Sequence, residues 1–86
     1  MQNDFKIVCD FIQNKINMNN KEFSKLLKMP YTTFRLVKSG TQNIDKLKFI
    51  YLLSFIKVKI LSLDLTTDRK NDCIKFINEM ENKYYE

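Results

Sequence analysis

The chain has 86 residues, of which 44% are hydrophobic, and its 15 basic and 10 acidic side chains give a net charge of +5. This length predicts a single domain over residues 1–86 with a small core, and the low content of glycine and proline (one of each) favours helices. The absence of histidine and of cysteine pairs at ligand spacing excludes the common zinc sites, and the longest apolar run, FIYLLSFI, is too short to cross a membrane.

Two helices are predicted in the first third of the chain. Asn3 is placed to cap a helix over residues 4–16, whose inward face recurs at helical spacing: Phe5, Val8, Cys9, Ile12 and Ile16. Asn19 is predicted to cap a second helix over residues 20–28, and Glu22 completes the spacing of a capping box. Its buried residues are Phe23, Leu26 and Leu27, with Met18 packing back on the first turn.

A short third helix is predicted over residues 31–38. Pro30 ends the second helix, and proline is well tolerated at the start of a new one. Phe34 and Val37 are expected to point inward, and Gly40 follows where a left-handed residue commonly closes a helix.

A fourth, central helix is predicted over residues 44–57, capped by Asn43 with Asp45 at its positive end. One face is lined by Ile44, Leu47, Ile50, Tyr51, Ser54, Phe55 and Val58. Further apolar residues make the helix hydrophobic nearly all round, as a central helix would be: Phe49, Leu52, Leu53 and Ile56.

The segment after the fourth helix changes its hydrophobic period. Residues 58–65 alternate in a way that is typical of a short β-strand, which could pair with a second copy of the chain or be an extended connector packed on its own core. A last helix is predicted from Thr67 or Asp68 to about residue 84. Its inward residues would be Cys73, Ile74, Ile77, Met80 and Tyr84, and the two cysteines are expected to be buried free thiols.

Positive charge is concentrated in the middle of the chain. Residues 15–59 contain ten basic residues against Glu22 and Asp45, whereas residues 60–86 contain four basic residues against six acidic ones. A local excess of this size favours a polyanionic partner, although a solvated lysine-rich surface is the simpler alternative.

Residues 18–40, MNNKEFSKLLKMPYTTFRLVKSG, resemble the helix-turn-helix of the lambda-repressor-like (Cro-type, xenobiotic-response-element) DNA-binding domains. Asn19 stands at the family's capping position and Asn20 where it usually has glutamine. The apolar and small positions of the motif are matched by Met18, Phe23, Ser24, Leu27, Met29, Phe34 and Val37, and the closing glycine by Gly40. With the flanking helices, the resemblance covers residues 4–57. Together with the last helix, the predicted elements give a compact, mainly α-helical domain of five helices with a helix-turn-helix and a possible short strand.

Three positions depart from the family's pattern. Lys28 replaces the usual glycine of the turn, where a left-handed backbone would cost a lysine about 1 kcal/mol. Ser24 replaces alanine, which is a mild change. Lys38 replaces glutamate and is expected to add charge that faces phosphate.

The resemblance implies that the exposed residues of the third helix read DNA bases, and these are Tyr31, Thr32, Arg35 and Leu36. Arg35 can bind guanine O6 and N7 together, and Leu36 can meet a thymine methyl group. Leu36 could instead serve the core or a dimer contact, and Tyr31 could pack across the Pro30 turn with its hydroxyl on a phosphate.

Other polar residues of the central segment are expected to contact phosphates, which position a protein on DNA. Asn19 and Asn20 are predicted at one helix N-terminus, and Thr41, Gln42 and Asn43 at the next, where free N–H groups attract anions. Lys38 and Lys46 add charge, with further contributions open to Lys21, Lys25 and Lys28.

These features predict a sequence-specific regulator of transcription that binds double-stranded DNA, similar to small repressors of phages, plasmids and mobile elements. We expect a cytoplasmic, nucleoid-associated homodimer that uses residues 58–86 for dimerisation and binds a palindromic operator. The alternative is a module on the same scaffold that binds a protein or RNA, such as a phage-encoded inhibitor. No catalytic constellation is found, and no cofactor, membrane or small-molecule ligand is expected.

Overall fold

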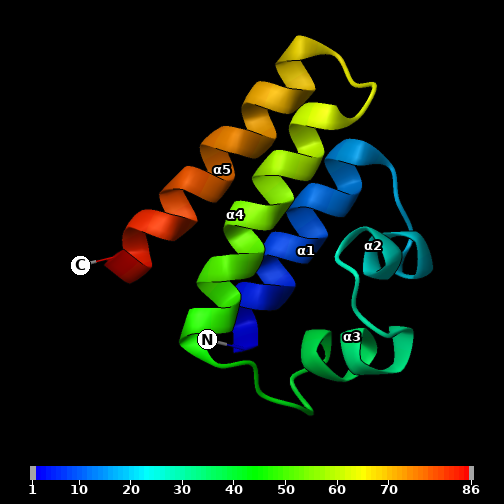
Figure 1. Ribbon diagram of the computed structural model, residues 1–86, viewed down its shortest axis with the longest axis vertical. Helices are drawn as coiled ribbons and strands as arrows, with labels where there is room; N and C mark the ends of the chain where they lie inside the picture. Colours follow the sequence, from blue (N-terminus) through cyan, green and yellow to red (C-terminus); the bar gives the residue numbers. More distant parts are fainter. Residues whose placement is uncertain (1, 86) are drawn as a thin grey trace.

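The computed structural model describes residues 2–85, and the side chains of residues 4–85. Residues 2–85 form five helices, α1 (Gln2–Ile16), α2 (Asn20–Leu26), α3 (Tyr31–Lys38), α4 (Lys46–Ser62) and α5 (Thr67–Tyr85). Figure 1 shows the three long helices α1, α4 and α5 running along the length of the molecule, with the short helices α2 and α3 together on one side. The helices α4 and α5 contact one another, and α1 contacts both α3 and α5.

The short helices are attached to the long ones mainly through aromatic residues. Phe34 of α3 is fully buried, and its ring centroid lies 6.0 Å from those of Phe5 in α1 and Phe23 in α2, in edge-to-face arrangements. Phe49 of α4 packs 6.3 Å from Phe5. Burial of each such side chain stabilises the fold by about 1.5–3 kcal/mol. Two isolated helices of two turns would lack this stabilisation.

The start of α2 follows the sequence prediction. Asn19 is the N-cap, its side chain accepts a 2.8 Å hydrogen bond from the Glu22 N–H, and the Glu22 carboxylate accepts a 3.0 Å bond from the Asn19 N–H. This reciprocal capping box is confirmed. The helix ends earlier than predicted, at Leu26, because Leu27 is already its C-cap.

The connection between α2 and α3 contains a strained residue. Lys28 has a φ of 55°, in the left-handed region that glycine occupies without cost. The Met29 N–H donates to the Ser24 carbonyl at 3.0 Å, which closes the turn over the end of α2. Lys28 therefore adopts a left-handed conformation that glycine would adopt at no cost. Gly40, with a φ of 85°, closes α3 as predicted.

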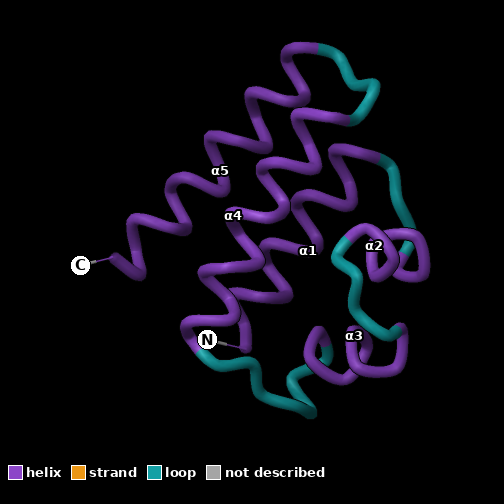
Figure 2. Tube along the Cα trace, viewed as in Figure 1, coloured by secondary structure: helices purple, strands orange, loops and turns teal. Residues whose placement is uncertain are grey.

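The predicted strand over residues 58–65 is wrong. Residues 58–62 belong to α4, residues 63–66 form a turn, and Figure 2 shows only helix and loop in the described part of the chain, residues 2–85. Ile60 is fully buried and continues the inward stripe of Ile56 one turn later. Extending an existing helix costs far less than starting a strand with no partner, so the helical option prevails.

The prediction for the start of α4 also needs correction. The helix begins at Lys46, and its N-cap is Asp45, which accepts a 2.8 Å hydrogen bond from the Lys48 N–H, so Asn43 lies outside it. The core-facing residues are Phe49, Leu52, Leu53, Ile56 and Ile60. Leu47, Tyr51 and Val58, which the sequence analysis assigned to one apolar face, are exposed on the opposite side of the helix.

The two ends of the chain lie against each other through α1 and α5. Lys83 Nζ lies 3.1 Å from Asp4 Oδ1, and the Tyr84 hydroxyl donates a hydrogen bond to the same carboxylate. The helix α1 begins at Gln2, before the predicted cap Asn3, whose side chain lies outside the described ones. Cys9 and Cys73 are both buried and free, as predicted.

The length and hydropathy of a helix determine whether it can cross a membrane. Among the described residues, none of the five helices combines the length and the apolar character that crossing a bilayer requires.

Candidate nucleic-acid interface

The rotation of α3 about its own axis decides which of its side chains are available. Phe34 and Val37 are 0% and 2% exposed, so this face of α3 is sealed against the core. The opposite face carries four exposed side chains, those of Tyr31, Thr32, Arg35 and Leu36. The orientation inferred from the sequence is confirmed, and the four residues predicted to read bases all lie on the outward face.

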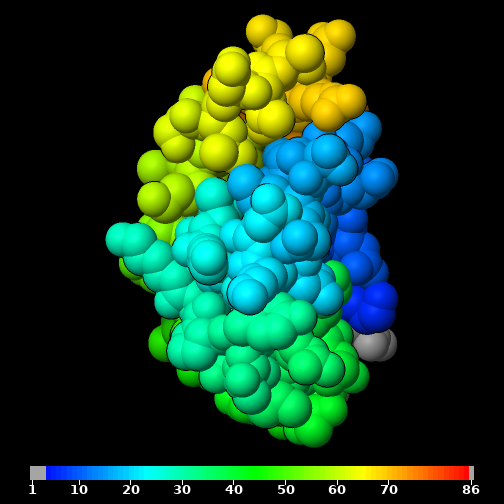
Figure 3. Space-filling model, turned by 90° about the vertical axis from the view of Figure 1, so that its right-hand side faces the viewer, coloured from blue at the N-terminus to red at the C-terminus, as the bar shows by residue number. Residues whose placement is uncertain are grey.

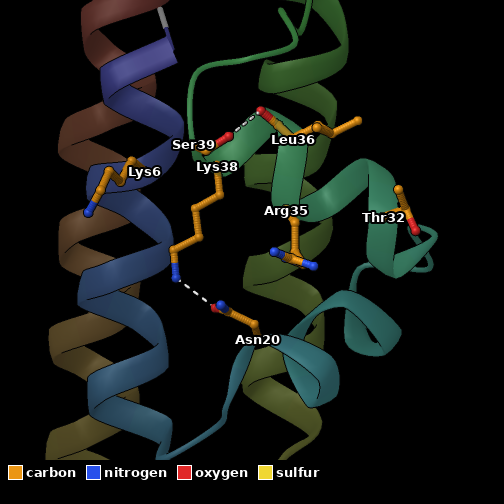
Figure 4. Close-up of a pocket in the computed structure, with 7 residues that line it drawn as sticks. All are labelled: Lys6, Asn20, Thr32, Arg35, Leu36, Lys38 and Ser39. Carbon is orange, nitrogen blue, oxygen red and sulfur yellow. Dashed lines mark hydrogen bonds between the residues drawn. The ribbon is translucent and has the colours of Figure 1, made fainter.

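Arg35 is the only arginine on this face, and its position is partly constrained. Its guanidinium carbon lies 5.7 Å from the centroid of the Tyr31 ring, one turn earlier on α3, which is a favourable cation–π distance. Figure 4 shows Arg35 projecting from α3 towards α2, with Thr32 at the turn and Leu36 further along the same outward face. The ring of Tyr31 therefore steadies the guanidinium on the exposed side of α3.

A shallow cavity of about 410 Å³ lies along this face of α3. It is lined by Lys6, Asn20, Thr32, Arg35, Leu36, Lys38 and Ser39 (Figure 4). Lys6 comes from α1 and Asn20 from α2, so three helices contribute. The sequence did not single out Lys6 or Ser39, since neither belongs to a recognisable spacing.

Lys38 was expected to face phosphate, but its side chain turns back into the domain. Its ammonium group donates hydrogen bonds of 2.8 Å to Gln13 Oε1 and to Asn20 Oδ1, and lies 3.3 Å from the carboxylate of Asp10. Only 17% of its side chain is exposed. The long lysine stem reaches back over α1 because acceptors lie there, so its charge is largely used within the domain.

The two asparagines at the start of α2 also have internal partners. Asn19 caps the helix through its side-chain oxygen, and Asn20 Oδ1 accepts hydrogen bonds from both Gln13 Nε2 and Lys38 Nζ. Gln13 is itself buried among the apolar residues of α1 and contacts the Met18 carbonyl. A buried glutamine on an apolar helix face was the signal for this network, and it was not recognised in the sequence.

The segment between α3 and α4 is exposed, but it is not a helix N-terminus. Thr41, Gln42 and Asn43 precede Lys46 by several residues, and the Thr41 and Gln42 N–H groups donate to the Leu36 carbonyl. The N-terminus of α4 is capped by the carboxylate of Asp45, which disfavours an anion there. Thr41, Gln42 and Asn43 therefore do not lie at a helix N-terminus as predicted, and Lys46 is an exposed charge at the start of α4.

Asp10 is an acidic group near the candidate interface whose charge is neutralised by lysines. Lys6 and Lys38 both contact the Asp10 carboxylate, and the Lys6 hydrogen bond is the main reason that the pKa of Asp10 is lowered, against a smaller opposing effect of burial. The helix α5, whose four acidic side chains are balanced by four basic ones, contacts α1 and α4 and lies on the far side from α2 and α3 (Figure 1). Figure 3 shows α2, α3 and the loop after α3 forming one continuous face.

Comparison with models of protein families, with curated proteins and with solved structures finds no significant match. Within residues 2–85, no group of three or more histidine, cysteine or acidic side chains is arranged to hold a metal ion.

Proposed function

We propose that the protein binds double-stranded DNA sequence-specifically and regulates transcription, with α2 and α3 acting as a helix-turn-helix. In this arrangement α2 lies across the DNA backbone and α3 enters the major groove. The observation that carries the proposal is the division of α3 into two faces. Phe34 and Val37 hold one face in the core, while Thr32 and Arg35 on the other are free to meet base edges.

The outward residues of α3 suit base recognition. The guanidinium of Arg35 can donate two parallel hydrogen bonds to guanine, and the Thr32 hydroxyl can bond several bases. Leu36, with 37% of its surface exposed, offers an apolar contact to a thymine methyl group. Tyr31 is positioned to orient Arg35 and to place its own hydroxyl on a phosphate.

Phosphate contacts in this proposal come from exposed charges around α3. Lys21, Lys25 and Lys28 are exposed on α2 and its turn, and Lys46 is exposed at the start of α4. Exposed lysines gain affinity by releasing counterions from the duplex. Asn20 contributes its backbone N–H group rather than its side chain, whereas the Asn19 N–H is already used in the capping box with Glu22. Lys38 contributes mainly through the internal contacts that hold α3.

The resemblance to small repressors of the lambda type suggests repression by occupancy of a promoter, in the cytoplasm and on the nucleoid. Selection from a pool of random duplexes tests this proposal, with single-stranded RNA of random sequence as a parallel pool. We expect the duplex pool to yield a consensus sequence. The logarithm of its binding constant should fall linearly with the logarithm of the salt concentration. Recovery of a consensus only from the RNA pool, or binding that is insensitive to salt, would overturn it.

A further inference from the structure

The outward face of α4 carries a row of exposed apolar side chains. Leu47, Tyr51, Val58 and Leu61 are 78%, 66%, 65% and 62% exposed, and the exposed Ser54 lies midway between them. The steps between successive positions are four, three, four and three residues, which is the seam of a helix that packs lengthwise against another helix. The core-facing residues of α4 lie on the opposite side of the helix.

A seam of this extent is unusual on a surface that meets only water. The four side chains expose on the order of 500 Å², comparable with the largest apolar patches of monomeric proteins, which commonly have a binding role. Two such surfaces brought together would bury on the order of 1,000 Å², the lower range of specific interfaces. The area therefore matches a weak, concentration-dependent dimer.

The order of side chains along the seam identifies the partner. Tyr51 lies three residues before Ser54 and Val58 four residues after it. Leu47 and Leu61 each lie seven residues from Ser54, in opposite directions. An antiparallel copy of α4 would set Leu47 opposite Leu61 and Tyr51 opposite Val58, with the small Ser54 where the two helices come closest. A surface that is its own complement under a two-fold rotation is what an isologous dimer requires. We propose that α4 is the interface of a homodimer, in which two α4 helices pack antiparallel about Ser54.

The groups flanking the seam show how charge would affect this dimer. On one flank Glu81 of α5 accepts a 3.1 Å hydrogen bond from the Ser54 hydroxyl and is paired with Lys57, so Lys57 carries little free charge. On the other flank lie Lys48, which lines a cavity with the α2–α3 turn, and Lys59, which lies over the Phe55 ring. The antiparallel pairing brings Lys48 near Lys59 of the second copy. Salt screens this repulsion, so dimerisation should strengthen with ionic strength.

The antiparallel arrangement has a consequence that rests on the proposed DNA-binding function. Figure 3 shows parts of α4 at the left edge of the face formed by α2 and α3, and Figure 1 shows α3 at the same end of the molecule as the N-terminal end of α4. A two-fold axis directed towards that face would leave both α3 helices on one side of the dimer, at opposite ends of the paired α4 helices. A helix of 17 residues is about 25 Å long, the scale of the ~34 Å between successive major grooves.

Cysteine cross-linking tests the pairing directly. Ser54→Cys should form a disulfide-linked dimer under mild oxidation, because the two-fold axis places this residue opposite itself. Leu47→Cys alone should not, since its copies would lie about 20 Å apart, but a mixture of Leu47→Cys and Leu61→Cys should. The native Cys9 and Cys73 are buried and give a low background. Self-linking of Leu47→Cys would indicate a parallel dimer, and failure of Ser54→Cys to link would overturn the proposal.

Sedimentation velocity without DNA separates this inference from the proposed function. Wild type should shift from monomer to dimer as concentration rises from low to high micromolar, and more so at higher salt. Val58→Glu should remain monomeric, whereas Ile7→Glu, at a 48% exposed apolar residue on α1, should behave as wild type. A wild type that stays monomeric throughout refutes the dimer whether or not DNA binds, and a dimer that binds no duplex refutes only the function.

Discussion

Lys38 Nζ lies 2.8 Å from Asn20 Oδ1 and thereby joins the end of α3 to the start of α2. The same ammonium group contacts Gln13 and Asp10 of α1, so one lysine connects three helices. Its position one residue after the buried Val37 means that it restrains the rotation of α3. That rotation determines whether Arg35 points outward, and Lys38 therefore supports the candidate interface from within.

Replacing Lys38 by methionine should destabilise the fold by about 1–3 kcal/mol, because the substitution removes the shared donor of Gln13 and Asn20 and leaves their partly buried oxygens short of a partner. Urea denaturation measures the loss. Lys46→Met is the matched control, since Lys46 is exposed and its replacement should change stability by less than about 0.5 kcal/mol. Equal stability of the two variants would show that the Lys38 contacts contribute little.

The same pair of variants should behave in the opposite order on DNA. Lys46→Met is expected to reduce the slope of log affinity against log salt by about 0.9, as the loss of one phosphate contact does. Lys38→Met, once folded, should leave that slope nearly unchanged because its ammonium group is already used internally. Titrations over a range of salt concentrations measure both slopes, and a larger change for Lys38→Met would place its charge on the DNA.

Arg35→Ala should relax sequence preference on a selected duplex and cost about 1–3 kcal/mol of binding free energy. The loss should be concentrated at one base pair, so that mismatched and matched sites become similar in affinity. Arg69→Ala is the control, because Arg69 is the other arginine of the chain and its guanidinium donates to the Lys15 carbonyl, away from α3. An unchanged specificity ratio for Arg35→Ala would exclude it from base recognition.

Lys28→Gly should stabilise the protein by about 1 kcal/mol. Lys28 is held at a φ of 55°, where a side chain with a Cβ atom is disfavoured and glycine is not. Lys25→Gly, within the exposed side of α2, should instead destabilise by about 1 kcal/mol, because glycine weakens a helix interior. Thermal unfolding of the two variants distinguishes them, and a destabilised Lys28→Gly would contradict the strain at this turn.

Asp4 should make the free energy of unfolding depend on pH in the acidic range. Burial tends to raise the pKa of Asp4, but hydrogen bonds from Tyr84 and Lys83 outweigh it, and the pKa lies below its ordinary value of 3.8. A carboxyl group whose pKa is lowered on folding contributes stability above its unfolded pKa, and that contribution is lost as pH falls through the folded pKa.

Asp4→Asn should therefore lower the unfolding temperature at neutral pH and flatten its decline between about pH 5 and about pH 3, relative to wild type. Asp64→Asn, at an exposed position in the turn before α5, is the control and should retain the wild-type profile. If Asp4→Asn and wild type lose stability in parallel over this range, the Asp4 contacts do not contribute to the acid dependence.

Much of the local structure was determined by short-range chemistry that the sequence displays. The capping box of Asn19 and Glu22, the break at Pro30 and the closing Gly40 each act within a few residues, and all were predicted. The inward direction of Phe34 and Val37 followed from helical spacing alone. These features depend on hydrogen bonds and dihedral preferences that neighbouring residues settle among themselves.

Other features depended on what packs against each segment. Val58 and Ile60 alternate as a strand would, but Ile60 is buried against the core and continues α4, so tertiary packing decided in favour of helix. The helix α4 is apolar on nearly all sides, so its periodicity could not distinguish the buried face from the exposed one. Lys38 found its acceptors on α1, 25 residues from Gln13 along the chain. Contacts over such separations arise only once the helices are assembled, because a sequence pattern records the chemistry of a side chain and not the identity of its distant neighbours.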